Sequence, residues 1–366
     1  MFSPRLKQTN STTRLSEGKD TPYLLGFGAS TLAEVSLADG KGTIYSANPT
    51  GWTAGDAVMT VKAVDSVLEM AIPLTALGEV QAGDELRLAA VISSGERDLQ
   101  SLPTGGPGQL VLPDLAMITY LLDVTDPAGD DKGPGTYTYP TDTVFKPGVF
   151  DVTNFKVGVD DKDLIFRFTI SGDIENPWSG GKGFSVQTLD VYVDKDPGKG
   201  TGARLLMPGR NAALTEGNGW DFAIWAESWT PQIVAPDPET LSPKQVTGAD
   251  YKIIVDPATK TITLRVPKSV FGEGDPATWG YAAAVLGQEG YPAAGVWRVR
   301  DVNETAEQWR FGGGAKDTNH TRIIDLVWAE GTEPTQESML STYPSSQKAV
   351  DQLTADDFAQ IQLMIP

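Results

Sequence analysis

Short runs of apolar and β-branched residues, each closed by glycine, proline, aspartate or asparagine, recur along most of this chain. Clear runs lie at residues 67–72, 85–92, 164–170, 185–193, 251–255 and 261–266. They are rich in Val, Ile, Phe, Tyr and Thr and are shorter than ordinary helices, as is typical of antiparallel strands. The 39 glycines and 25 prolines are spread between the runs as turn residues. The pattern predicts an all-β protein built as an antiparallel β-sandwich, with one short helix over residues 354–362.

An internal repeat indicates two related modules in this chain. Residues 67–93 align without a gap on residues 261–287, and the alignment places Pro73 on Pro267. Both copies are a strand that ends in proline, a short turn with an apolar plug, and a second, buried strand. Chance similarity between two pairs of strands is the alternative explanation.

The two copies differ in the length of chain that precedes them. About 150 residues precede the repeated motif in the second module, but only about 70 precede it in the first. We therefore expect a partial β module over residues 23–113 and a complete β-sandwich over residues 114–366. A polar segment over residues 1–22 is expected to be flexible or to act as an arm donated to a neighbour. A half-sandwich exposes sheet edges and a bare core face, so missing sequence or another chain must cover it.

Charge and composition exclude several classes of function. A formal net charge of −19 repels phosphate backbones and anionic lipids, so nucleic acid is not an expected partner. With no cysteine, disulfides, thiolate zinc sites and cysteine nucleophiles are excluded. The single histidine, His320, is expected to be an exposed polar residue. No apolar run reaches the roughly 18 residues of a membrane span, and the opening residues show no signal-peptide core.

The segment DVTDPAGDDKGPGTYTYPTD (123–142) holds five aspartates among three glycines and three prolines. Its carboxylates at Asp126, Asp130 and Asp131, with Asp151 returning from the next strand, could supply oxygen ligands to calcium. The spacing is not that of an EF-hand, which needs an acidic residue at the twelfth loop position. The alternative is a set of Asx turns in which the aspartates accept local backbone N–H bonds. Spacing alone leaves both hypotheses open.

A second acidic loop, DVYVDKDPGKGTG, follows another strand. Asp190 and Tyr192 alternate with valines, which predicts one polar and one apolar face. Asp194 and Asp196 are expected to form the turn, with ion binding as the alternative.

Eight of the nine tryptophans lie after residue 177. Trp178, in a loop rich in glycine and proline, and Trp225 and Trp229, in GWDFAIWAESW, are the candidates for a platform on which a pyranose ring stacks. Asp221 and Glu227 would take the sugar hydroxyls. Core packing is the alternative for each tryptophan.

Trp297 and Trp309 stand beside Arg298, Arg300 and Arg310 in WRVRDVNETAEQWRFGGG. Arginines next to aromatic rings favour cation–π and arginine–carboxylate contacts. We expect these residues to form an internal network rather than a sugar site.

Three long segments, residues 126–157, 217–229 and 296–331, resemble the C-terminal domain of bacterial glucodextranases, a module similar to one in amylopullulanase-type and S-layer-associated proteins. The resemblance covers residues 114–366, and residues 60–112 resemble the tail of a preceding related module. It implies a β-sandwich of the DOMON and family 9 carbohydrate-binding-module kind. It also implies a non-catalytic accessory role on secreted, surface-attached glycan-processing proteins, and it favours calcium in the acidic loop.

Together these features predict a non-catalytic, calcium-stabilised, extracellular or cell-surface module that binds polysaccharide or cell-envelope glycan. A structural alternative is a surface protein that self-assembles into a filament or S-layer-like lattice, each copy completing the partial module of a neighbour. A fragment of a glycoside hydrolase is the third hypothesis, with Asp221 and Glu227 as acid and base. It is weak because almost any acidic protein offers such a pair.

Overall fold

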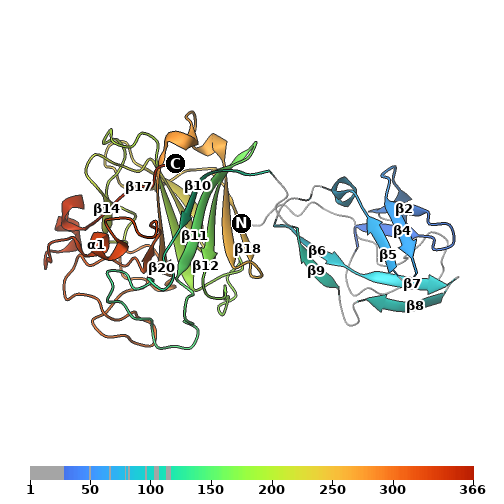
Figure 1. The fold of residues 1–366 in the computed structure, drawn as a ribbon, viewed down its shortest axis with the longest axis horizontal. Coiled ribbons are helices and arrows are strands. Elements are labelled where there is room, and N and C mark those ends of the chain that lie inside the picture. The colour runs from blue at the N-terminus through green and yellow to red at the C-terminus, as the bar shows by residue number, and fades with distance from the viewer. Residues whose placement is uncertain are drawn as a thin grey trace. The chain divides into compact units, whose positions relative to one another are not determined.

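The structure is a computed structural model that describes residues 29–48, 51–65, 67–78, 80, 83–94, 97–102, 107–112 and 117–366. The N-terminal segment 1–22 considered above lies outside these residues. The chain divides into two compact units, residues 1–115 and 116–366, each described here by itself (Figure 1). In the described ranges, every helix is too short or too polar to cross a membrane.

Unit 1, residues 1–115, is built from short antiparallel pairings. A three-stranded sheet has the order β1-β2-β3, and three separate pairs are β4-β5, β6-β9 and β7-β8. The elements are β1 (Thr31–Val35), β2 (Gly42–Asn48), β3 (Gly51–Ala54), β4 (Thr60–Val64), β5 (Val67–Ala71), the 3₁₀ helix η1 (Leu74–Leu77), β6 (Glu85–Leu88), β7 (Ala90–Ser94), β8 (Arg97–Leu102) and β9 (Gly108–Val111).

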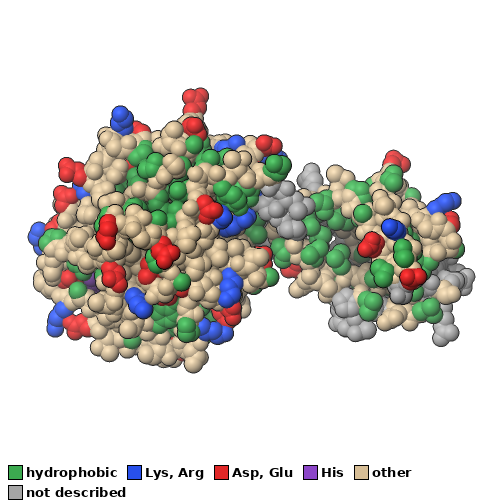
Figure 2. All heavy atoms as spheres, in the orientation of Figure 1, with side chains coloured by type: hydrophobic (Ala, Val, Ile, Leu, Met, Phe, Trp, Pro, Cys, Tyr) green, Lys and Arg blue, Asp and Glu red, His purple; other side chains and the backbone are tan. Residues whose placement is uncertain are grey.

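The described part of unit 1 buries little apolar surface. Its buried hydrophobic side chains are Ile44, Met59 and Leu112. By contrast, Val58 is 81% exposed and Leu37 is 65% exposed, and hydrophobic side chains are visible across the surface of this unit (Figure 2). Exposed apolar side chains in this number are typical of a surface that contacts another segment or chain.

Unit 2, residues 116–366, contains two antiparallel sheets that face each other (Figure 1). The five-stranded sheet contains, in order, β10 (Thr119–Thr125), β11 (Val152–Val159), β12 (Asp163–Ile170), β19 (Thr261–Pro267) and β18 (Lys252–Asp256). The six-stranded sheet contains, in order, β17 (Pro243–Gln245), β16 (Gln232–Pro236), β15 (Phe222–Ala226), β13 (Gln187–Asp194), β20 (Gly280–Gly287) and β21 (Asp325–Leu326). The prediction of an all-β sandwich is confirmed.

The remaining elements of unit 2 are short and lie in its loops and C-terminal part. They are β14 (Ala212–Leu214), η2 (Lys268–Val270), η3 (Pro276–Thr278), α1 (Gln336–Ser341), η4 (Val350–Gln352), η5 (Ala355–Asp357) and β22 (Ala359–Ile361). The helix predicted over residues 354–362 is wrong, because this segment forms η5 and then β22, which pairs in parallel with β14. Ala359 and Ile361 are buried and alternate with the half-buried Gln360, as a strand requires.

The core of unit 2 lies between the two sheets. In β12, Phe166 and Phe168 are fully buried, while the intervening Arg167 is only half-buried, which is the alternation of a strand with one face on the core. Phe166 meets Tyr281 of β20 with ring centroids 6.1 Å apart, so the sheets are in direct contact. All eight residues of β13 and of β20 are buried, so the six-stranded sheet is covered on both faces at its centre.

The repeated segments fold alike locally. Pro73 and Pro267 each precede a 3₁₀ helix, with φ/ψ of −59°/136° and −55°/128° respectively. Each follows an antiparallel hairpin, β4-β5 in unit 1 and β18-β19 in unit 2. The difference is that β19 also pairs with β12, whereas β5 pairs only with β4 among the described residues.

Candidate functional site

The acidic loop between β10 and β11 is held against β21 of the other sheet. Gly129 and Gly133 have φ of 86° and 55°, values that favour glycine and let the loop turn sharply. The N–H of Gly133 donates to the carbonyl oxygen of Ile324 at 2.8 Å. A Cβ at Gly133 would lie 2.9 Å from the carbonyl oxygen of Ile323, so this close approach requires glycine.

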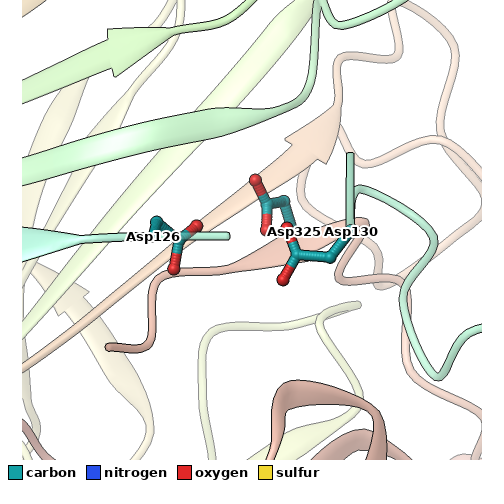
Figure 3. Close-up of side chains that lie close together, drawn as sticks. All are labelled: Asp126, Asp130 and Asp325. Carbon is teal, nitrogen blue, oxygen red and sulfur yellow. The ribbon is translucent and has the colours of Figure 1, made fainter. Parts of the chain in front are cut away.

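Three aspartates converge where the loop meets β21. Carboxylate oxygens of Asp126, Asp130 and Asp325 all lie within 4.8 Å of one another, and Figure 3 shows Asp126 facing the other two. Asp126 and Asp325 are 3% and 0% exposed. Each of the three carboxylates keeps one buried oxygen, Oδ2 of Asp126 and Oδ1 of Asp130 and Asp325, without a hydrogen-bond partner in the described residues.

The other oxygens of this group are fixed by backbone donors. The N–H of Trp328 donates to Oδ1 of Asp126 at 2.6 Å, and the N–H of Val152 donates to Oδ2 of Asp325 at 2.6 Å. Two carboxylates are therefore held in place by one oxygen while the second oxygen points into the cluster. This arrangement prepares ligands at little further cost in side-chain entropy.

Burial and mutual repulsion disfavour the charged forms of these carboxylates. Burial is the main cause that raises the pKa of Asp126 to about 9 and of Asp130 to about 7, and neighbouring carboxylates add to it. The pKa of Asp325 is also raised well above its usual range by burial and by Asp126 and Asp130. Among the described residues, no lysine or arginine neutralises the three. The cluster must hold either protons or a cation.

The donor set fits a hard divalent cation. It offers carboxylate oxygens, which calcium prefers, and among the described residues it contains no sulfur or imidazole ligand of the kind that zinc selects. Two further carboxylates, those of Asp131 and Asp151, lie beside this donor set and accept hydrogen bonds. The hydroxyl of Tyr139 donates to Asp131, and the N–H of Gly129 donates to Oδ1 of Asp151 at 3.0 Å.

The four residues proposed from sequence as metal ligands thus lie in one region, but only Asp126 and Asp130 belong to the converging group. Asp131 accepts the hydroxyl of Tyr139 and Asp151 accepts the N–H of Gly129, and neither bond is the local Asx turn of the alternative hypothesis. Asp325 was missed. The signal was present, because an aspartate inside the apolar run IIDLVW is buried with its strand and therefore needs a counter-charge.

These pKa values predict how the free energy of unfolding depends on pH when a chelator keeps metal ions away from the protein. The unfolded carboxyls lose their protons near the ordinary value of 3.8, but the folded protein keeps those of Asp130 and Asp126 to about pH 7 and 9. The folded state therefore binds more protons between about pH 4 and 9, and the free energy of unfolding falls as the pH rises, by at most about 1.4 kcal/mol per pH unit for each group. Urea unfolding at pH 5, 7 and 9 in EDTA measures this slope. A free energy of unfolding that stays constant or increases over this range would contradict it.

A second acidic group differs from the first in its hydrogen bonding. Oxygens of Asp194, Asp196 and Asp221 also lie within 4.8 Å of one another. However, both oxygens of Asp194 accept backbone N–H groups at 3.0 Å, from Asp196 and Gly219. Asp221 accepts the N–H of Lys195 at 2.8 Å. These residues form a hydrogen-bonded turn at the end of β13.

The tryptophans proposed as a sugar platform are not all exposed. The expectation that Trp225 is exposed is wrong: it is 4% exposed, because β15 lies inside a sheet covered on both faces, and it stacks on Trp297 at 5.6 Å. Trp229 is 40% exposed, with the guanidinium of Arg298 5.3 Å from its ring. Trp178 is half-buried and contacts Trp309 instead, at 6.3 Å.

The two acidic residues proposed beside these tryptophans lie at opposite ends of β15. Asp221 precedes the strand and Glu227 follows it, so about 20 Å separates them at the rise of an extended strand. Glu227 is fully buried and accepts the N–H groups of Trp229 and Thr230. This separation does not fit the roughly 5–9 Å between the carboxyls of a glycoside hydrolase.

His320 is not the exposed residue that was expected. Its Nδ1 lies 3.1 Å from the carbonyl oxygen of Asp317, and its Nε2 lies 3.0 Å from that of Val302. The imidazole links two loops of unit 2.

The two packed sheets, with a carboxylate cluster where the β10–β11 loop meets β21, define unit 2 as an all-β sandwich module. Residues 121–354 match the family described as the SLH-like C-terminal binding module of glucodextranase. The match covers well over half of the chain, and the chain belongs to this family. The match confirms the resemblance inferred from the sequence. The family is one of binding modules rather than catalytic domains. None of the curated proteins matches the chain.

Proposed function

We propose that this protein is a non-catalytic, extracellular module that binds polysaccharide or cell-envelope glycan and thereby keeps a glycan-processing enzyme at its substrate or at the cell surface. The observation that carries the proposal is the family match, which spans nearly the whole sandwich and includes the acidic loop. The distance between Asp221 and Glu227 argues against this pair as the acid and base of a glycoside hydrolase.

Calcium is the proposed structural cofactor. The oxygens of Asp126, Asp130 and Asp325 that lack a hydrogen-bond partner among the described residues support it, because they come from a loop and from a strand of the opposite sheet. An ion shared between them would fasten the loop to the sandwich and remove the repulsion between the carboxylates. Its effect on glycan binding would be indirect, through the position of the loops.

The test is a depletion assay with the full chain. The protein is mixed with increasing amounts of insoluble α-glucan or isolated cell-wall material, in calcium and in EDTA, and the unbound fraction is measured. We expect saturable binding that weakens in EDTA. Absence of saturable binding to both materials in calcium would refute the glycan-binding role.

Unit 1 favours a second candidate function, assembly with other copies of the chain. In unit 2, β19 pairs with β18 on one edge and with β12 on the other. The equivalent strand of unit 1, β5, pairs with β4, and its other edge has no partner strand among the described residues. Exposed apolar side chains such as Val64, Val67 and Met70 lie on the same hairpin. Such an edge accepts a strand from another molecule, and repeated head-to-tail contacts of this kind build filaments or lattices.

Light scattering of the purified chain distinguishes the two candidates. Assembly predicts masses well above the 39.1 kDa of one chain, increasing with protein concentration and with no glycan present. Replacing exposed apolar residues of the hairpin, Val67→Lys and Met70→Lys, should return the mass to that of a single chain. A single-chain mass for the wild-type protein in calcium and in EDTA would exclude assembly.

A further inference from the structure

Two tryptophans from distant parts of the chain form one aromatic surface on unit 2. Trp178 lies between β12 and β13, and Trp309 lies between β20 and β21. Their ring centroids are 6.3 Å apart with an interplanar angle of 58°. Both also contact Phe145, at 6.1 and 6.0 Å. Trp309 is 37% exposed and Trp178 is half-buried, so the pair presents aromatic surface to solvent above a buried phenylalanine.

The rings are held from below by a buried arginine. The guanidinium of Arg300 lies 5.0 Å from the Phe145 ring centroid and 5.7 Å from that of Trp178. It also donates to the carbonyl oxygens of Trp309 at 2.6 Å and Gln288 at 2.7 Å. Burial lowers the pKa of Arg300 to about 10, and the group remains charged at neutral pH. Rings fixed in this way lose little freedom when a ligand stacks on them.

Polar groups border this aromatic surface. Arg310 donates to Glu289 at 2.6 Å, and Glu289 also pairs with Arg300. Next to Trp309 in the sequence, the exposed Gln308 donates its side-chain amide N–H to the Asp142 carboxylate at 2.9 Å. Planar guanidinium, carboxylate and amide groups around an aromatic surface are the combination that fixes sugar hydroxyls while a ring face is stacked.

We infer that Trp309 and Trp178, with Arg310 and Gln308 at their border and the buried Glu289 positioning Arg310, form the subsite that contacts a neutral hexopyranose unit of a polysaccharide. This inference rests on the proposed function and assigns it a place on the molecule. Neutral sugar is the expected class, because a chain with a formal charge of −19 repels acidic polymers. Because Trp309 is 37% exposed, the expected ligand is a chain segment that lies across the rings rather than a small molecule enclosed in a cavity.

The test measures binding of the full chain to dextran and to soluble starch by affinity electrophoresis, with polygalacturonate as the acidic probe. Trp309→Ala should weaken binding to the neutral glucan about tenfold or more, as loss of a central aromatic contact does. Trp309→Phe should recover most of the affinity, because it restores an aromatic face. Trp229→Ala is the matched control: Trp229 is 40% exposed, against 37% for Trp309, and lies over Arg298 instead. It should change the affinity less than twofold.

Each outcome decides a different question. If Trp309→Ala binds like the wild type, or if Trp229→Ala shows the larger loss, the subsite is wrong but glycan binding stands. If the wild type binds polygalacturonate more tightly than either glucan, the neutral-sugar assignment is wrong. If the wild type binds none of the three polymers and no cell-wall material, the proposed function itself fails. Unchanged thermal unfolding of Trp309→Ala shows that a loss of affinity is not a loss of fold.

Discussion

Calcium at about a hundred times its dissociation constant should stabilise the folded protein by about 2.7 kcal/mol, which corresponds to a rise of roughly 5–10 °C in the melting temperature of unit 2. The reason is the group of three buried carboxylates, Asp126, Asp130 and Asp325, whose inward oxygens have no partner in the described residues. Differential scanning calorimetry in EDTA and in a calcium series measures the effect. Magnesium should give a smaller rise, because it gives up its water shell reluctantly.

Asp325→Asn tests the assignment most sharply. It should abolish the calcium-dependent rise, while the melting temperature in EDTA should equal or exceed that of the wild type, because the amide is neutral without having to bind a proton, whereas the buried carboxyl must bind one. Asp196→Asn is the control, because Asp196 is an exposed member of the hydrogen-bonded acidic turn. It should keep the full calcium response. A calcium response that survives Asp325→Asn, or that disappears in Asp196→Asn, would show that the ion binds elsewhere.

Breaking the buried ion pair of Asp190 and Arg210 should cost about 3–5 kcal/mol of stability. Both side chains are completely buried, and Nε and Nη2 of Arg210 donate to the two carboxylate oxygens at 2.7 and 3.0 Å. Arg210 also donates to the carbonyl oxygen of Trp297 at 2.8 Å, so it connects β13 with two loops. Asp190→Ala would leave the guanidinium buried without its counter-charge. Urea unfolding of Asp190→Ala measures the loss.

Two further variants separate this effect from general damage. Asp123→Ala removes an exposed carboxylate that pairs with Lys156 at 2.7 Å, and it should cost less than about 1 kcal/mol. The double variant Asp190→Leu, Arg210→Met should be more stable than Asp190→Ala, because it leaves no isolated charge in the core. If Asp190→Ala costs no more than Asp123→Ala, the buried pair does not contribute as its geometry indicates.

Strand positions were accessible from the sequence wherever the pattern is local. Runs such as residues 164–170 and 261–266 coincide with β12 and β19 because their alternating or continuous apolar residues fit a strand regardless of its neighbours. The C-terminal segment was mispredicted as a helix because β22 owes its form to β14, a partner distant in the sequence. Pairing over such a distance leaves no local signal.

The candidate site residues also fall into those that local sequence indicates and those that only the packing of distant segments brings together. The density of aspartate and glycine in one loop marked Asp126 and Asp130, whereas Asp325 joined them only through the packing of that loop on β21. For the tryptophans, composition showed that aromatic side chains were available but not which of them reach solvent. Trp225 is buried and Trp309 is partly exposed, because burial depends on which face of a sheet is covered.

The sequence by itself determined the β class, the repeated strand-turn-strand segment, the family and the acidic loop, because each depends on residues close together in the chain. Only the tertiary structure decided which carboxylates converge, that Asp190 is neutralised by Arg210, and that Trp178 and Trp309 form one surface. These contacts join residues from different strands and loops. Their energies come from burial and from the stronger attraction between opposite charges in the interior, and both arise only once the two sheets have packed together.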